Sequence, residues 1–215
     1  SRTELVARLI ASQGGLDSTI LRTGRLTEDD WPKLSKAVGK LKDKGLYIDD
    51  TPALHINQMR ARARLKKRQH DIGMIVVDYI GLATSDAKGR EERIGDVSRG
   101  LKALAKELDI PIIALAQLNR DCENRTDKRP LLSDLRDSGS LEQDADIVSF
   151  IYRDEVYNED SPSKGVAEII TRKWRNGQTG TDHLASQLHL SRFENLSPNY
   201  QPAVAQVTRL KGYAS

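Results

Sequence analysis

Two short apolar segments, separated by a long amphipathic one, constrain the fold of this chain more than any other feature. Residues 74–77 read MIVV and residues 110–117 read IPIIALAQ, while the residues from Glu91 to Leu108 have the spacing of a helix. Apolar strands that alternate with helices are typical of a parallel sheet covered by helices on both faces. The pattern therefore predicts an α/β fold with a mostly parallel sheet.

Further elements are expected along the rest of the chain. A helix over 3–13 has Ser1 or Thr3 available as a cap, and two more are predicted from about Thr27 or Asp30 to Gly45 and over 56–70. Strands are predicted over 46–50, 146–153, 166–174 and 183–188, and a polar loop over 127–146. Residues 198–215 show no periodicity, so we expect one domain over 1–197 followed by a tail.

Three of the predicted strands end in polar side chains. Asp49 and Asp50 end the strand at 46–50, Asp78 follows MIVV, and Gln117 ends IPIIALAQ. Ligands of α/β sheets bind beyond the carboxyl ends of the strands. We therefore expect these side chains to meet at one edge of the sheet and to form a site.

Asp78 and Gln117 each have two interpretations. An acid at the tip of a buried strand is the pattern of a Walker B element, whose carboxylate holds a hydrated Mg²⁺ beside nucleotide phosphates. Many strands also end on an acid by chance. The amide of Gln117 is suited to contact a γ-phosphate or an attacking water, or simply to make a hydrogen bond at the strand end. The residues alone leave both choices open.

Two later stretches carry cations that suit phosphate chemistry. In the loop 127–146, Arg136 and the backbone at Ser138-Gly139 are suited to follow the phosphates of one nucleic-acid strand, and the loop has no aromatic residue for base stacking. Lys173 and Arg175 lie two apart at a predicted strand end, so they share a face and are suited to stabilise a transferring phosphoryl group. A solvated strand end is the alternative.

The composition indicates a globular protein but does not identify a binding partner. The net charge of +3 is too small to indicate a polyanion, and the six positive charges within residues 60–68 are explained either by nucleic acid or by a solvated helix face. No apolar run approaches the length that spans a bilayer. The single Cys122 excludes an intramolecular disulfide, and the four histidines have no metal-ligand spacing. We expect a soluble cytoplasmic protein.

Several segments together resemble the DnaB family of hexameric replicative DNA helicases, in their RecA-like C-terminal motor domain. They include LIASQGGLDSTILRTGRLTEDDW, YIDDTPAL, MIVVDYIGL, GLKALAKELDIPIIALAQLNR, DKRPLLSDLRDSGSLEQDADIVSFIYR, RKWRNGQTGT and RFENL. The resemblance runs from Ser1 to about Pro198 and implies a RecA-like P-loop NTPase core that binds ATP and Mg²⁺.

The resemblance also implies roles for residues at matching positions. Asp78 is the expected Walker B carboxylate, with Mg²⁺ held through water, and Gln117 the sensor between the γ-phosphate and the DNA-binding loops. Lys173 and Arg175 match the basic pair that acts across a subunit boundary, with Arg175 as the arginine finger and Trp174 pointing away from both. Further matches are with residues that contact DNA (Arg136, Asp137, Gly139) and with an arginine near the phosphates (Arg8). Asp137 replaces a glutamate that is common in the family.

One family motif does not occur in these residues. There is no GxxxxGK[ST] phosphate-binding loop, and Ser1 matches the position just after the catalytic glutamate of the family. We therefore expect these 215 residues to be inactive alone and to belong to a longer protein. That protein is expected to be an ATP-dependent homo-hexameric helicase that moves 5′ to 3′ on single-stranded DNA at the replication fork and meets primase and a helicase loader, in a bacterial nucleoid or a phage-infected cell.

Two alternatives accompany this interpretation. One is a RecA-like ATPase of the recombinase or clock type, which forms filaments or rings without unwinding DNA. The other is a non-catalytic module that binds single-stranded DNA or regulates a helicase ring. The missing phosphate-binding loop favours the second alternative if the chain is natural.

Overall fold

The computed structural model of the protein describes residues 1–42 and 44–197, so the predicted tail at 198–215 lies outside the described residues. Its helices are α1 (Arg2–Gly14), α2 (Ser18–Thr23), α3 (Asp30–Lys42), α4 (Ile56–His70), α5 (Arg90–Leu108) and α6 (Gly139–Asp144). Its strands are β1 (Ile75–Val77), β2 (Ile112–Ala114), β3 (Ile147–Tyr152), β4 (Val166–Trp174), β5 (Gly180–Gln187) and β6 (Arg192–Asn195). Short 3-10 helices are η1 (Ile80–Leu82), η2 (Arg120–Asn124), η3 (Leu132–Ser138), η4 (Asp154–Val156) and η5 (Leu188–Leu190).

The helices begin and end at residues suited to their ends. Ser1 accepts a hydrogen bond from the backbone of Glu4 at 3.4 Å while Glu4 accepts one from the amino terminus at 3.0 Å, which closes a capping box on α1. Gly15, at φ 62°, ends that helix in the left-handed conformation that glycine adopts without strain. The predicted closure of α4 by Asp71 is confirmed.

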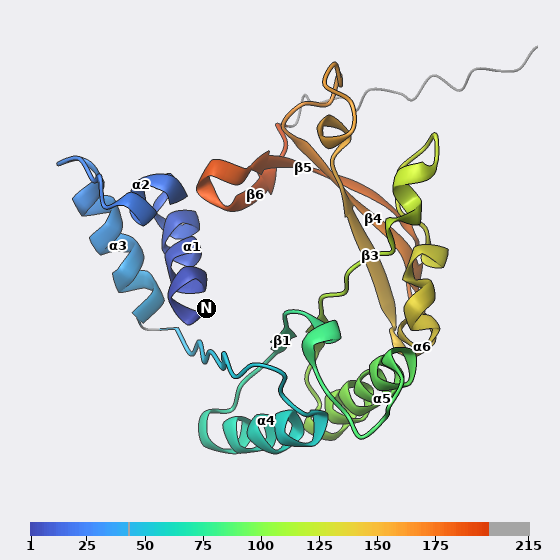
Figure 1. The fold of residues 1–215 in the computed structure, drawn as a ribbon. Helices are drawn as coiled ribbons and strands as arrows, with labels where there is room; N and C mark the ends of the chain where they lie inside the picture. The colour runs from blue at the N-terminus through green and yellow to red at the C-terminus, as the bar shows by residue number, and fades with distance from the viewer. Residues whose placement is uncertain (43, 198–215) are drawn as a thin grey trace, which may run out of the picture.

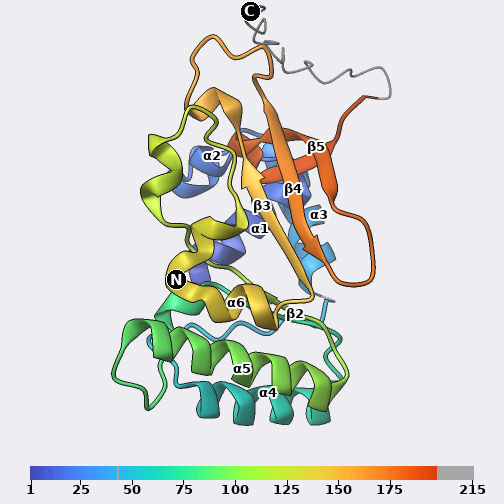
Figure 2. The ribbon, with the colours of Figure 1, turned by 90° about the vertical axis from the view of Figure 1, so that its right-hand side faces the viewer.

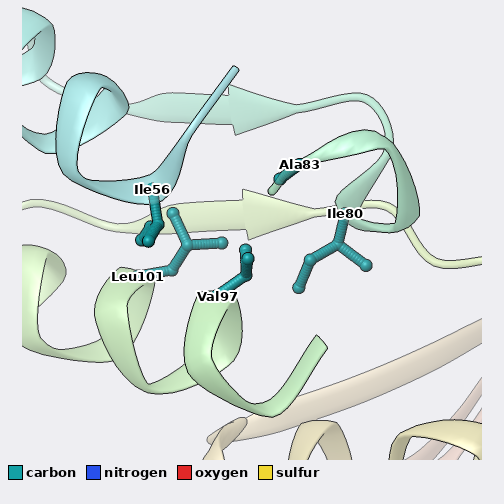
Figure 3. Packing of buried hydrophobic residues seen from close by; sticks show 5 residues of the cluster. All are labelled: Ile56, Ile80, Ala83, Val97 and Leu101. Carbon is teal, nitrogen blue, oxygen red and sulfur yellow. The ribbon is translucent and has the colours of Figure 1, made fainter. Parts of the chain in front are cut away.

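The first sheet is a parallel pair that rests on two helices. β1 pairs with β2 in the register Val76↔Ile113, and α5 connects the two strands along the chain. Helices α4 and α5 lie together on one side of this pair (Figures 1 and 2). The buried cluster between them and η1 holds Ile56, Ile80, Ala83, Val97 and Leu101 (Figure 3). Burial of these side chains drives this packing.

The other face of the pair is not covered by the described residues. Val76 and Ile113, which point away from α4 and α5, are 55% and 47% exposed. The prediction of helices on both faces is therefore wrong for the described part of the chain, because α1–α3 lie apart from the β1–β2 pair and pack mainly with one another and η5 (Figure 1).

The second sheet is antiparallel, in the order β3-β4-β5-β6. The strands over 146–153, 166–174 and 183–188 are confirmed, but the expectation of a mostly parallel sheet holds only for β1 and β2. A parallel neighbour needs a crossover of a dozen or more residues, usually a helix, and the connections from β4 to β5 and from β5 to β6 are too short for one. The connection from β3 to β4 is longer but contains the short η4 in place of a crossover helix. No α-helix lies between the strands over residues 147–195, so they fold as hairpins. A second buried cluster, Leu135, Phe150, Tyr152 and Ile170, joins this sheet to η3.

The predicted strand at 46–50 is wrong. A strand requires a hydrogen-bonded neighbour, and residues 46–50 have none in the described part of the chain. Their side chains instead follow α4, with Tyr47 stacked on His70 at a ring distance of 4.4 Å and Asp49 bound to Arg62 at 2.6 Å. Among the described residues, no helix is long and apolar enough to cross a membrane.

Candidate functional site

The parallel register of β1 and β2 brings Asp78 and Gln117 to the same edge of the sheet. Asp78 directly follows β1, and Val77 accepts a 2.9 Å backbone hydrogen bond from Leu115, which in turn accepts one of 2.9 Å from Ile80. These two bonds hold the backbone on either side of Asp78 against the end of β2. Gln117 lies three residues beyond β2 on the same edge.

The side chains of Asp78 and Gln117 are free to bind. Both residues are exposed, and neither side chain has a hydrogen-bond or ion-pair partner within residues 1–42 and 44–197. A carboxylate that is not engaged in the protein fits the outer coordination of Mg²⁺, which keeps several waters and needs one or two carboxylates. The donor set at this edge is therefore compatible with a hydrated magnesium ion.

A small cavity opens beside the same edge. It has a volume of about 50 Å³ and is lined by Tyr79, Ile80, Gly81, Arg90, Ile94, Ala116, Gln117, Leu118, Asn119, Asp134 and Leu135. A β-carbon at Gly81 would lie 2.7 Å from the ring of Tyr79, so any other residue there would have to displace that ring. The cavity can hold water but is far smaller than the few hundred Å³ of a nucleotide site. A nucleotide would have to bind on the open edge.

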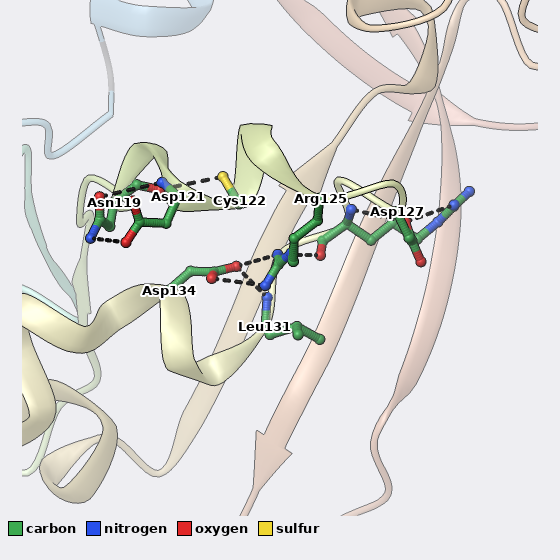
Figure 4. Close-up of polar contacts among 8 residues, drawn as sticks. Asn119, Asp121, Cys122, Arg125, Asp127, Leu131 and Asp134 are labelled. Atoms are coloured by element: carbon green, nitrogen blue, oxygen red, sulfur yellow. Dashed lines mark hydrogen bonds and ion pairs between the residues drawn. The ribbon is translucent and has the colours of Figure 1, made fainter.

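The segment that follows Gln117 is fixed to η3 by one buried carboxylate. Asp134 is only 5% exposed and accepts two hydrogen bonds from the guanidinium of Arg125, at 3.0 and 2.7 Å (Figure 4). It also accepts the backbone N–H of Leu131 at 2.8 Å, and its carbonyl accepts that of Asn119 at 3.1 Å. Asp134 thus ties the residues just beyond Gln117 to the segment predicted to contact DNA.

That predicted DNA segment, residues 136–139, is helical. Arg136 and Asp137 lie in η3, and Gly139 is the first residue of α6, with helical φ −52° and ψ −27°. The predicted loop over 127–146 is thus largely helical at its end. The side chains of 136–138 lie outside the described residues, so their predicted contacts remain predictions. Gly139 is exposed.

Lys173 and Arg175 share a face, as predicted, and both meet the carboxyl end of α6. Lys173 donates to the carbonyl of Glu142, and Arg175 donates through Nη2 to the carbonyl of Gln143 at 2.6 Å. Carbonyls at a helix end carry partial negative charge, which favours cations there. Trp174 lies over Gly177, where a β-carbon would approach its ring to 2.5 Å. The indole therefore rests on the turn that follows β4.

The Asp49-Asp50 pair is not brought to this edge. Asp49 binds Arg62 beside α4, and Asp50 accepts from Arg2 at 3.3 Å, so the expected convergence of three strand ends is wrong. It fails because residues 46–50 are not a strand. Arg8 is exposed on α1.

The basic helix α4 uses most of its cations within the fold. Arg64 donates to both oxygens of Glu107 at 2.5 and 2.8 Å, and Arg60 lies 3.6 Å from the same carboxylate. Lys67 pairs with Asp71 at 2.6 Å, and Lys66 lies 4.8 Å from the centre of the Tyr47 ring. These contacts favour a packed helix face over a nucleic-acid surface, the alternative left open by the charge run.

Comparison with known proteins identifies the family of this chain. The family model described as the DnaB-like helicase C terminal domain matches residues 1–195. The replicative DNA helicase DnaB of Geobacillus stearothermophilus is 47% identical over 206 residues, which are 94% of this chain and 45% of that protein. The corresponding figures for the replicative DNA helicase DnaC of Bacillus subtilis (strain 168) are 44% identity, 93% and 45%.

Solved structures resemble the whole described fold. One, described as an ATPase domain, superposes with a TM-score of 0.87 at 39% identity, over 92% of this chain and 72% of that one. A DnaB-like replicative helicase whose interactions with primase have been described gives a TM-score of 0.87 at 39% identity, over 92% and 50%.

The expected RecA-like α/β fold is thereby confirmed, although the chain spans less than half the length of these curated relatives. It belongs to the DnaB-like helicase C-terminal domain family.

Proposed function

We propose that these residues form the greater part of an ATPase motor in a ring-shaped replicative DNA helicase. The observation that carries the proposal is the shared edge of β1 and β2, where Asp78 and Gln117 stand together with free side chains. Family membership supports this assignment, because a carboxylate and an amide at one sheet edge suit the binding of a nucleotide with its magnesium ion. The motif GxxxxGK[ST] does not occur in the 215 residues, so turnover is proposed for the full-length protein.

Each side chain has a distinct role in the proposed motor. Asp78 holds the hydrated Mg²⁺, which when bound neutralises charge on the nucleotide phosphates. Gln117 contacts the terminal phosphate or the attacking water. Asn119, two residues further along the chain, donates its backbone N–H to the carbonyl of Asp134, and through this contact the state of the nucleotide passes to η3. Lys173 and Arg175 stabilise the transferring phosphoryl group of the neighbouring subunit.

DNA movement follows from this arrangement. Arg136, Asp137 and Gly139 hold the backbone of one DNA strand in the channel of a homo-hexamer, and sequential hydrolysis moves the strand 5′ to 3′. Recognition of the backbone alone makes the movement independent of sequence. We propose that the intact protein acts in the cytoplasm with primase and a loader as partners. The solved relative whose interactions with primase have been described supports primase as a partner. Arg8 is proposed to lie near the phosphates.

The test of the finger assignment is Arg175→Ala in the full-length protein. An arginine finger contributes roughly 10³ to 10⁵ in kcat, so we expect DNA-stimulated ATP hydrolysis to fall at least about a thousandfold, with nucleotide affinity nearly unchanged. Arg172→Ala is the matched control, because Arg172 is exposed on the same strand and its side chain has no hydrogen-bond or ion-pair partner among the described residues. Equal turnover of Arg175→Ala and the wild type would contradict the assignment.

Forked DNA substrates separate the proposed helicase from its alternatives. The helicase displaces a strand from a fork in the presence of ATP. A RecA-like ATPase of the recombinase type hydrolyses ATP without displacement, and a non-catalytic module binds single-stranded DNA without hydrolysis. Full-length protein that binds DNA but neither hydrolyses ATP nor displaces a strand would overturn the proposed function.

A further inference from the structure

One carboxylate outside the proposed catalytic edge holds Arg175 in place. Asp146 Oδ1 lies 3.2 Å from Arg175 Nη1, and the carbonyl of Asp146 accepts the backbone N–H of Arg175 at 2.9 Å. With the contact from Nη2 to Gln143, both the backbone and the guanidinium of Arg175 are tethered. Without these contacts, the long side chain of an arginine is free to adopt many rotamers.

The tether leaves Arg175 able to bind another group. A guanidinium has five N–H donors, and the contacts with Gln143 and Asp146 use two of them. The other three have no partner among the described residues, and the side chain is 48% exposed. The contacts with Gln143 and Asp146 therefore orient the planar guanidinium and leave three N–H donors available to another group.

Asp146 is itself fixed from α5. Lys102 donates to Asp146, Ser98 donates to Asp144 at 2.6 Å, and a β-carbon at Gly95 would lie 3.3 Å from the Ser140 hydroxyl. Positions 95, 98 and 102 fall on one face of a helix. This face holds α6 and the residues after it along its length, and α5 joins the two strands whose ends carry Asp78 and Gln117.

We infer that Asp146 is a positioning residue for Arg175, and that α6 links Arg175 to the predicted DNA segment, which ends at the first residue of that helix. A shift of α6 on DNA binding would then move the guanidinium that serves the neighbouring subunit. This inference rests on the proposed function, since it assigns a purpose to Arg175 only if that residue acts on a nucleotide.

The contact suits orientation better than it suits stability. The side chain of Asp146 is 58% exposed, and exposed ion pairs contribute little to folding. The hydrogen bond from Lys102, and then the charges of Lys102, Arg175 and Lys173, lower the pKa of Asp146, so its carboxylate stays charged at neutral pH. Removal of this carboxylate should therefore leave the fold intact.

The experiment compares Asp146→Ala, Asp146→Glu and Arg175→Ala in the full-length protein. Because misplacement of a catalytic group by about 1 Å costs up to roughly 100-fold, we expect Asp146→Ala to lower the DNA-stimulated kcat by about 10- to 100-fold. KM for ATP and affinity for single-stranded DNA should change less than about twofold, since neither ligand contacts Asp146. Asp146→Glu should recover most of the rate, because it restores the carboxylate. Asp71→Asn, which removes an exposed pair with Lys67, is the control.

A double variant separates positioning from a merely structural role. In the Arg175→Ala background, Asp146→Ala should reduce kcat no further, because its effect passes through Arg175. Losses that multiply, or a wild-type rate for Asp146→Ala when Arg175→Ala is inactive, would overturn the inference and leave the proposed function standing. Full activity of Arg175→Ala would instead contradict the role that the proposed function gives to Arg175. If Asp146→Ala does not assemble, Asp146→Asn keeps the side-chain shape and is held to the same comparisons.

Discussion

Asp134 is the residue on which the path from Gln117 to the predicted DNA segment depends. Its carboxylate is buried and bound by Arg125 through two hydrogen bonds. Asp134→Ala leaves the guanidinium of Arg125, which is 31% exposed, and the backbone N–H of Leu131 without their acceptor. We expect it to increase amide hydrogen exchange across 117–138 by roughly ten- to a hundredfold.

The control for Asp134 is Asp127→Ala in the same full-length protein. Asp127 is 69% exposed at 3.4 Å from Arg129, so its loss should change exchange in this segment less than about threefold. Similar exchange in both variants, measured by mass spectrometry, would show that Asp134 does not hold the segment.

The location of a single residue was predictable from the sequence when the residue directly followed an apolar strand. Asp78 and Gln117 follow apolar strands, so the sequence pattern predicted that they share an edge, as the structure shows. Asp134 and Asp146 are acids in a polar stretch, and their importance comes from Arg125 and Arg175. Long-range pairing of this kind leaves no periodic signal, and no pattern in the sequence distinguished these two acids from their neighbours.

At the scale of elements, the contact between residues 46–50 and α4 has a defined pH dependence. Hydrogen bonds from Arg62, and then from Thr51, lower the pKa of Asp49 from 3.8 to about 2. A carboxylate whose pKa is lowered in the folded state contributes its full stabilisation above pH 3.8. That contribution is lost as the pH falls towards 2. Because Asp49 is 42% exposed, we expect this contact to contribute less than about 1 kcal/mol to the free energy of unfolding.

Asp49→Asn should therefore lower the melting temperature of the full-length protein by about 1–3 °C. The difference from the wild type should be the same at every pH between 8 and 5. Arg62→Gln should give a similar decrease, and the double variant little more than either, since both remove one contact. A difference that already shrinks between pH 7 and pH 5 would mean that Asp49 titrates near neutrality and that the assigned contact is wrong.

Elements with strong local signals were predicted well, and those that depend on neighbours were not. The predicted helix over 56–70 matches α4, because its spacing and the Asp71 cap are local features. Residues 46–50 have a strand-like composition but no partner strand among the described residues, and they follow α4 instead. β6 was missed because its four residues are too short to show alternation, and pairing with β5 alone defines it.

At the scale of the whole molecule, the proposed catalytic residues come from two different sheets. Asp78 and Gln117 belong to the parallel pair, whereas Lys173 and Arg175 end a strand of the antiparallel sheet. The α/β class was predictable from alternating strands and helices, but the division into two sheets was not, because it depends on which later connections contain a crossover helix. An arrangement with catalytic groups on separate surfaces is what a site shared between subunits requires.

Mixed rings test the central claim, that Asp78 and Arg175 complete one site from two subunits. Full-length Asp78→Asn and Arg175→Ala proteins, each inactive alone, are co-expressed with different tags, and rings that carry both tags are purified. At random mixing, about one quarter of the interfaces combine an intact Asp78 with an intact Arg175 from the neighbour. We predict that ATP hydrolysis measured without DNA, when the sites do not have to act in sequence around the ring, returns to as much as about one quarter of the wild-type rate under the same conditions. Mixed rings as inactive as either parent would contradict a shared site.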